Sequence, residues 1–118
     1  MLPAQNRMTR STDFGATVKR GVRAAQPDIV VHVRRDEGSV DGPRIGLVVA
    51  KSVGSAVQRH RVARRLRHVA RGLMAELEPC ERVVIRALPG SCDAPSSQLE
   101  RQLRNGLKRS HNLMGARR

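Results

Sequence analysis

Residues 51–71 read KSVGSAVQRHRVARRLRHVAR, which combines a helical spacing of apolar residues with a complete lack of Asp and Glu. From Val62 to Leu77 the apolar residues recur at intervals of three and four, as expected for one face of an amphipathic helix. Ser55 is a good N-cap, and we expect the helix to run from there to about residue 77 or 78, before Pro79. One face would pack on a core and the other would present cations.

The cations of this helix have no acidic neighbours, because no carboxylate occurs between Asp41 and Glu76. On a helical wheel the apolar stripe lies within roughly 60° of Val62, and most of the cations lie on the opposite side. Arg59 falls near the margin of the stripe, so its head group should point towards the sheet edge or a cleft. Such a face is either simply solvated or binds a polyanion, and the planar fork of arginine favours phosphate. The candidate anion-binding residues are Lys51, Arg59, His60, Arg61, Arg64, Arg65, Arg67, His68 and Arg71.

The whole chain is strongly basic, with a formal net charge of +13 over 118 residues. This length is that of one domain, and such a charge points first to a nucleic-acid partner. An anionic membrane surface and an acidic protein are the alternatives. No apolar run approaches the roughly 20 residues of a membrane-spanning helix, and the N-terminus lacks the apolar run of a secretory signal peptide. The sequence therefore predicts a cytoplasmic protein that binds a polyanion and no membrane.

The elements around the long helix are predicted from apolar patterns and turn signals. In chain order they are a basic arm at 1–10, a helix from residue 11 or 12 to Gly21, a strand at 28–33, a loop at 34–43, a strand at 44–50, a strand at 81–88, and a last helix that opens at Ser97 with a capping box to Glu100. A further short strand fits residues 22–25. Residues 113–118 are predicted to form a flexible tail.

The order of these elements predicts how the strands pair. The strands at 28–33 and 44–50 are joined by a modest loop and suggest an antiparallel pair. The nearly continuous apolar run of the second suggests a central position in the sheet. The strand–helix–strand order that follows suggests a parallel crossover. The chain is therefore predicted as a single α+β domain, 1–118, built as a two-layer α-β sandwich with a small mixed sheet.

The residue types that a protein active site needs occur only at scattered positions. The carboxylates fall in loops and at helix ends, and Cys80 and Cys92 lack metal-binding spacing, so no catalytic and no metal-ligating residue is predicted. The thiols are expected to be reduced, with a disulfide as the alternative. His32 is either a structural histidine or part of a cleft. Segment 51–55 either offers backbone N–H groups to a phosphate or is a plain strand-to-helix turn.

Several segments together resemble the bacterial ribonuclease P protein subunit. That family carries the approximate signature K-x-[VI]-G-x-A-V-x-R-N-R-x-[KR]-R-x-x-R, which this chain resembles in Lys51-x-x-Gly54-x-Ala56-Val57-x-Arg59-His60-Arg61, followed by Arg64 and Arg67. The resemblance continues upstream in Asn6-Arg7-Met8, in Asp13-Phe14 with Gly21, and in the strand that begins Arg44-Ile45-Gly46-Leu47. It covers nearly the whole chain.

This resemblance implies a fold, an activity and partners. The family fold is an α-β sandwich with a left-handed βαβ crossover. The family works with a catalytic RNA in a ribonucleoprotein that hydrolyses precursor tRNA and releases its 5′ leader. The RNA and its bound Mg²⁺ perform the chemistry, so the protein is an endoribonuclease subunit, expected to be monomeric in the holoenzyme, without a protein-only active site. The arginine-rich motif would bind the catalytic RNA, and Phe14, Val18 and His32 would line a leader-binding cleft.

The chain departs from the family pattern at a few positions. His60 replaces the usual Asn between two arginines, and Ser55 replaces an Asn after the glycine. Val18 stands where relatives often have a second aromatic residue, so Phe14 should supply most of the stacking on the leader. A ribosomal or other RNA-scaffold protein of similar size and charge is the main alternative.

Overall fold

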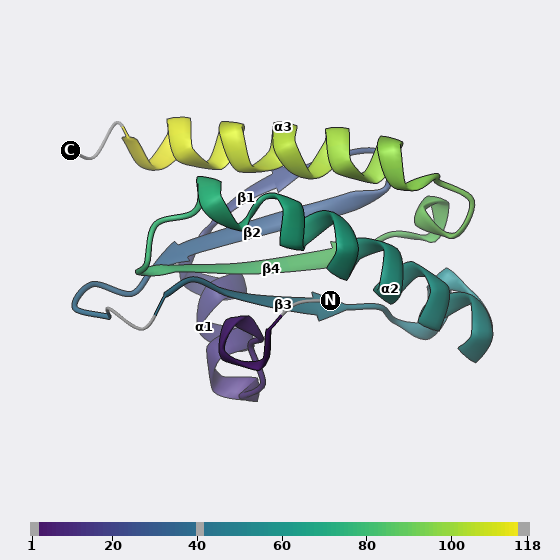
Figure 1. Ribbon diagram of the computed structural model, residues 1–118, viewed down its shortest axis with the longest axis horizontal. Helices are drawn as coiled ribbons and strands as arrows, with labels where there is room; N and C mark the ends of the chain where they lie inside the picture. Colours follow the sequence, from purple (N-terminus) through teal and green to yellow (C-terminus); the bar gives the residue numbers. More distant parts are fainter. Residues whose placement is uncertain (1–2, 40–41, 116–118) are drawn as a thin grey trace.

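The computed structural model describes residues 3–39 and 42–115. Its elements are α1 (Ser11–Arg20), β1 (Val22–Ala25), β2 (Ile29–Arg35), β3 (Arg44–Val48), α2 (Ala56–Gly72), β4 (Glu81–Ala87) and α3 (Ser96–Gly115), with 3₁₀ turns at Ala4–Asn6, Lys51–Val53, Met74–Glu76 and Pro89–Cys92. Within the described residues the strands form one four-stranded sheet in the order β1-β2-β4-β3 (Figure 1). Only the β3–β4 pair is parallel among these neighbours.

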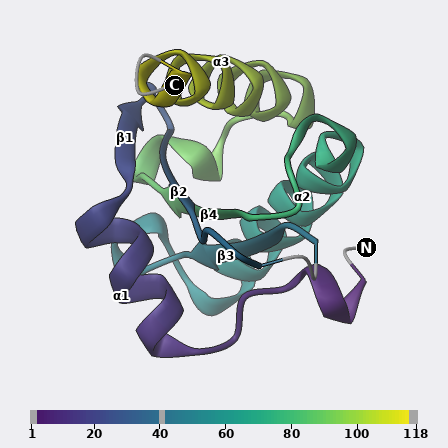
Figure 2. The ribbon, with the colours of Figure 1, turned by 90° about the vertical axis from the view of Figure 1, so that its left-hand side faces the viewer.

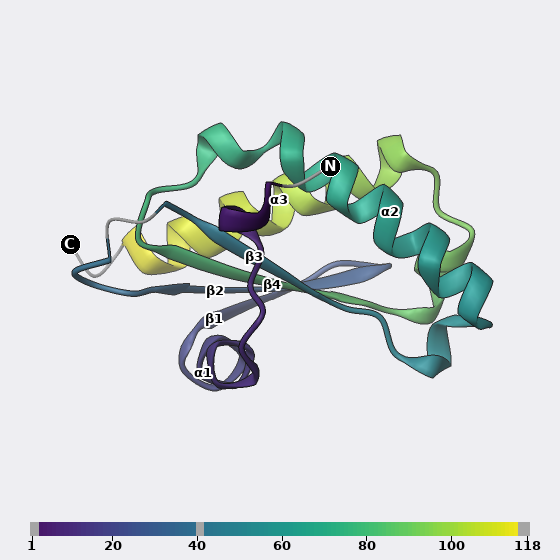
Figure 3. The same ribbon diagram turned by 60° about the horizontal axis from the view of Figure 1, so that its bottom comes forward.

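The helices divide between the two faces of this sheet. α2 and α3 lie side by side over one face, and α1 lies over the other (Figures 2 and 3). In Figure 1, α2 lies in front of the sheet, the parallel strands β3 and β4 point to the right, and β4 lies above β3. When this view is turned until the two strands point upward, β4 lies to the left of β3. The β3-α2-β4 crossover is therefore left-handed, against the usual right-handed rule. The predicted α+β sandwich, its unusual crossover and the short strand at 22–25 are confirmed.

The predicted position of the strand at 44–50 is wrong. β3 lies at the edge of the sheet, and β4 separates it from β2, so the two strands expected to form an antiparallel pair are not neighbours. The apolar run has another explanation. Ile45 belongs to the core beneath the helices, while Gly46 on the opposite face lies against the ring of Phe14. An edge strand that is covered on both faces has the same nearly continuous apolar sequence as a central strand.

The predicted basic arm is packed against this edge strand. Arg7 forms an isolated parallel bridge with Ile45, and the Met8 N–H donates to the Ile45 carbonyl over 2.9 Å. The Asn6 side-chain amide donates to the Pro43 carbonyl, also over 2.9 Å. Met8 is buried. The arm thus pairs with backbone groups of β3 that would otherwise remain exposed at the sheet edge.

The apolar stripe of α2 packs as the wheel predicts. Val62, Leu66 and Val69 are at most 3% exposed and share one core with the inner faces of the strands and with Leu99, Leu103 and Leu107 of α3. The helix ends earlier than predicted, at Gly72, and a 3₁₀ turn carries the chain on to Leu77, which is still buried. Glycine is a poor helix former, which explains the early end.

α3 is longer than predicted at both ends. It begins at Ser96, one residue before the expected cap, and continues to Gly115, so residues 113–115 of the predicted tail are helical and the rest of that tail lies outside the described residues. Gly106 sits inside this helix, where a Cβ would lie 2.6 Å from a methyl carbon of Val31. The helix therefore loses some propensity at Gly106 but gains a close approach to β2.

Two glycine variants test the packing of α1. In Gly46→Ala the new Cβ would lie 2.5 Å from two ring carbons of Phe14, so we expect a loss of about 1–3 kcal/mol in the free energy of unfolding. Gly15→Ala is the matched control, because nothing lies within 4 Å of its Cβ and it should stabilise α1 by about 0.5–1 kcal/mol. Urea denaturation followed by circular dichroism measures both, and equal stabilities would contradict the proposed contact.

Candidate nucleic-acid interface

The start of α2 is fixed by a reciprocal capping box. The Ser55 hydroxyl accepts from the Gln58 N–H over 3.2 Å, and the Gln58 side-chain oxygen accepts from the Ser55 N–H over 2.8 Å. Gly54 precedes the cap with a φ of 155°, which suits glycine. Ser55 is thus confirmed as the N-cap, and the box occupies the N–H groups of Ser55 and Gln58. Its S-x-x-Q pattern was readable in the sequence, and phosphate binding at this turn stays a prediction.

α2 presents its cations in two groups that differ in exposure. Arg61, Arg64 and Arg71 are exposed, as are His60, His68 and, just before the helix, Lys51. Arg59, Arg65 and Arg67 are half-buried. In the part of the chain that the structure describes, no ion pair joins an α2 arginine to a carboxylate. The exposed group therefore forms a surface of uncompensated positive charge.

Arg65 has a structural task. Its Nη1 donates to the Ala94 carbonyl over 3.1 Å and its Nη2 donates to the Cys92 carbonyl over 3.0 Å. These bonds tie α2 to the segment that leads into α3. Arg65 was expected among the RNA-binding residues, but its two terminal nitrogens are already engaged within the protein.

Arg59 and Arg67 turn away from the exposed row in α2. The Nε of Arg59 is buried without a hydrogen-bond partner, in agreement with its predicted place at the margin of the apolar stripe. Arg67 reaches over the edge strand and lines a cavity of about 160 Å³ together with Arg7, Met8, Thr9, Phe14, Ile45, Gly46 and Leu47. Arg67 and Phe14 were predicted to serve different sites, and the structure brings them to the same cavity.

The predicted leader cleft lies on the α1 face of the sheet, but its residues differ in access. Phe14 is half-buried against Gly46, and Val18 is 41% exposed. His32 is only 3% exposed, and both of its ring nitrogens are buried without a hydrogen-bond partner. The structure therefore offers Phe14 and Val18 at the surface and keeps His32 inside the protein.

The surroundings of His32 disfavour its protonated form. Burial is the main cause of its lowered pKa, and the positive charges of Arg23 and Arg86 lower it further. Arg23 lies directly opposite His32 in the β1–β2 register, and Arg86 lies on the neighbouring strand. The ring is thus neutral at physiological pH, with one donor and one acceptor nitrogen.

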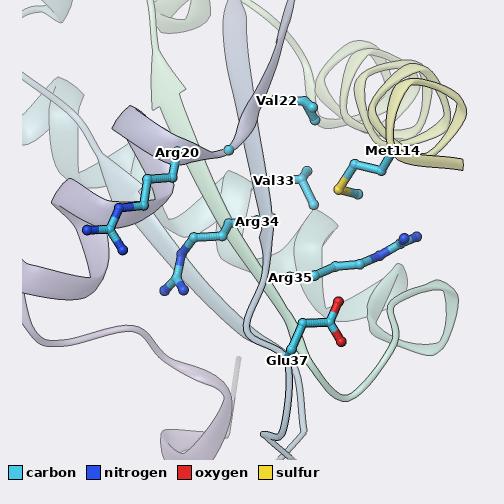
Figure 4. A pocket seen from close by; sticks show the side chains of 8 residues that line it. Arg20, Val22, Val33, Arg34, Arg35, Glu37 and Met114 are labelled. Atoms are coloured by element: carbon cyan, nitrogen blue, oxygen red, sulfur yellow. The ribbon is translucent and has the colours of Figure 1, made fainter. Parts of the chain in front are cut away.

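A larger cavity, of about 430 Å³, opens between the end of α1, the start of β1, the end of β2 and the end of α3 (Figure 4). Arg20 and Arg34 point to the same side of it, and the Arg34 Nε donates to the Thr17 hydroxyl over 3.4 Å. Arg35 and Glu37 line its other side. This cavity could not be predicted from the sequence, because its residues come from four separate elements and the segment after β2.

The remaining reactive groups are potential metal ligands and two thiols. Among residues 3–39 and 42–115, no group of three or more His, Cys, Asp or Glu side chains could hold a metal ion. Cys80 and Cys92 are free thiols, and burial together with nearby carboxylates raises the pKa of Cys80, so it is protonated at neutral pH. No helix within the described ranges is long and apolar enough to cross a membrane.

The chain is similar to known proteins over nearly its whole length. A family model described as Ribonuclease P matches residues 2–111. The chain belongs to the ribonuclease P protein family. The ribonuclease P protein component of Mycobacterium avium is 68% identical over 112 residues, which cover 92% of this chain and 94% of that protein. The component from Mycobacterium tuberculosis is 59% identical over 116 residues, covering 98% of each.

Solved structures of ribonuclease P proteins share the fold. That of Staphylococcus aureus matches with a TM-score of 0.77 at 23% identity, over 87% of this chain and 93% of that one. That of Thermotoga maritima matches with a TM-score of 0.75 at 22% identity, over 87% and 96%. The expected function is confirmed: the chain is a protein component of ribonuclease P, the RNA–protein endoribonuclease that processes the 5′ leaders of precursor tRNA. This outcome decides against the ribosomal alternative.

The structural task of Arg65 is testable. Arg65→Ala removes both donors to the Cys92 and Ala94 carbonyls, so we expect the free energy of unfolding to fall by about 1–3 kcal/mol. Arg64→Ala removes an exposed neighbour of the same charge and should change stability by no more than about 0.5 kcal/mol. Urea denaturation measures both variants. If the two variants prove equally stable, the hydrogen bonds of Arg65 to the Cys92 and Ala94 carbonyls do not stabilise the fold.

The lowered pKa of His32 predicts a pH dependence of stability. Below its ordinary pKa of 6.5 the unfolded ring takes up a proton that the folded ring resists, so stability present above about pH 6.5 is lost as the pH falls. In His32→Gln this contribution disappears, and the stability curve between pH 7.5 and 5.5 should be flatter than that of the native protein. Denaturation at several pH values measures the difference, and parallel curves would rule out this role.

Proposed function

We propose that the exposed cations of α2 bind the catalytic RNA of ribonuclease P. The observation that carries the proposal is the row of Arg61, Arg64 and Arg71, which are exposed and form no ion pair with any described carboxylate. Isolated positive charges on one rigid helix repel one another, and phosphate removes that repulsion. Lys51, His60 and His68 extend the same surface, and Arg59 and Arg67 flank it. Arg65 supports this surface mainly by holding α2 in place.

We further propose that the α1 face of the sheet receives the 5′ leader. Phe14 and Val18 supply apolar surface there, and Arg23 and Arg86 are exposed cations on the same face for the leader's phosphates. His32 lies beneath them as a neutral, uncommitted group, which a leader base would reach only after a local shift of α1. Two surfaces on opposite sides of the sheet would then hold the catalytic RNA and the substrate together.

In this arrangement hydrolysis belongs to the RNA and to Mg²⁺ bound by the RNA. The role that we propose for the protein is to bind and position the catalytic RNA and the precursor tRNA. We also propose that the subunit is monomeric in the holoenzyme and acts in the cytoplasm. The two free cysteines are in keeping with a reducing compartment.

A charge-removal experiment tests the catalytic-RNA surface. In the double variant Arg61→Ala/Arg64→Ala, affinity for the cognate ribonuclease P RNA should fall, and the slope of log K against log salt should shrink by about 0.7–0.9 for each lost phosphate contact. The matched control is Arg101→Ala/Arg109→Ala, which removes the same charge from the exposed side of α3. Filter binding at several salt concentrations measures both, and an unchanged slope in the α2 variant would refute the assignment.

A cleavage assay tests the division of labour. Precursor tRNA is incubated at low Mg²⁺ with the cognate RNA, with and without protein, and with protein alone. The protein should stimulate cleavage by the RNA, and the α2 variant should stimulate less at equal concentrations. Cleavage by RNA-free protein would contradict the proposal.

A further inference from the structure

One apolar side chain is out of place on the cationic face of α2. Val57 is 62% exposed, whereas the apolar residues Val62, Leu66 and Val69 of the same helix are at most 3% exposed. Valine is a weak helix former, so an exposed valine contributes little to the stability of the helix itself. Single exposed apolar residues are common on protein surfaces, so the groups around Val57 decide whether it has a role.

The neighbours of Val57 on the helix are cations and an imidazole. Positions 57, 60, 61 and 64 follow the i, i+3, i+4, i+7 spacing and share one face. Together with Ala56 they line a shallow cavity of about 430 Å³, which we call the Val57 groove: Ala56, Val57, His60, Arg61 and Arg64. Arg61 and Arg64 also line an adjoining cavity of about 400 Å³ with Arg65, His68 and Ser96. The groove thus has an apolar end and a cationic middle.

The chemistry of this groove matches an unstacked nucleotide. A phosphate gains nothing from a valine side chain, but the flat face of a base is apolar and is stabilised when both surfaces leave water. An imidazole stacks on bases, and His60 stands one helical turn from Val57. Bases inside a duplex show their faces only to one another, so the occupant must be unpaired and turned out.

We propose that the Val57 groove holds one unpaired, unstacked nucleobase of the ribonuclease P RNA, with Arg61 and Arg64 on the phosphates beside it. This inference rests on the proposed RNA-binding role of α2 and adds to it a preference for a single-stranded position. The charge of the groove decides the occupant: two exposed arginines without carboxylate partners, Arg61 and Arg64, line it together with the valine, so a polyanion fits and an ordinary apolar protein partner does not.

The test uses the full chain and the cognate ribonuclease P RNA. Val57→Thr keeps the shape and the β-branch but replaces a methyl group with a hydroxyl, and Val57→Ile keeps the surface apolar. We expect Val57→Thr to weaken binding about fivefold, with an unchanged salt slope because no charge is lost, and Val57→Ile to bind like the native protein. Leu113→Ala, at a 48% exposed leucine of α3, is the control and should bind normally.

A second measurement identifies the contacted group. Chemical probing of the complex should show one unpaired base that is protected by the native protein and reactive with Val57→Thr. Removing that base from the RNA should weaken binding of the native protein and should cost Val57→Thr nothing more, a non-additivity that a phosphate contact does not produce. Additive losses, or native affinity in Val57→Thr, would overturn the proposal.

The outcomes also separate this inference from the role of the helix. If Arg61→Ala/Arg64→Ala weakens binding and Val57→Thr does not, the groove proposal fails and the RNA-binding surface stands. If neither variant changes binding, both fail. If sedimentation shows a dimer of the free native protein that Val57→Thr dissociates, the groove serves a second copy of the chain and the proposal is overturned.

Discussion

The structure depends on the burial of one stripe of α2. Val62, Leu66 and Val69 sit at 0–3% exposure against the sheet and α3, and this contact fixes both the position and the rotation of the helix. Because side chains on a helix are locked in phase, burying the stripe determines which side chains face water. The hydrophobic core therefore sets the direction of the cationic face, and the hydrogen bonds from Arg65 to the Cys92 and Ala94 carbonyls help to hold the helix there.

Two buried carboxylates, Asp28 and Glu81, help to build the scaffold. Buried Glu81 accepts from the His111 Nε2 at 3.0 and 2.8 Å and lies 4.0 Å from the Arg35 Nε. Asp28 accepts from the side-chain amides of Gln98 and Gln102, each over 2.7 Å, which anchors α3 to the start of β2. The residues that these contacts join lie far apart in the sequence. They stabilise the fold and leave the exposed α2 arginines without partners.

Features that depend on a local sequence pattern were predicted correctly. Contacts between segments far apart in the sequence were not. The stripe of α2 and the Ser55 cap follow from spacing within one helix, and both are confirmed. The placement of β3 depends on where β4 inserts, which no local pattern encodes. Arg65 shows the same limit within the site, because its partner carbonyls at 92 and 94 lie about 30 positions away. The left-handed crossover was expected only through the family resemblance, because composition gives no hint of it and the general rule for βαβ units favours the opposite hand.

The edge position of β3 also changes how the two proposed surfaces relate. If β3 were central, a further strand beside it would separate the side chains of α2 from the face of the sheet that α1 covers. With β3 at the edge, Arg67 of α2 reaches over the strand to the cavity that Phe14 lines from α1. Gly46 allows this, since any side chain there would displace the ring. Arg67 flanks the proposed catalytic-RNA surface and Phe14 belongs to the proposed leader surface, so the two proposed surfaces adjoin at the cavity beside β3.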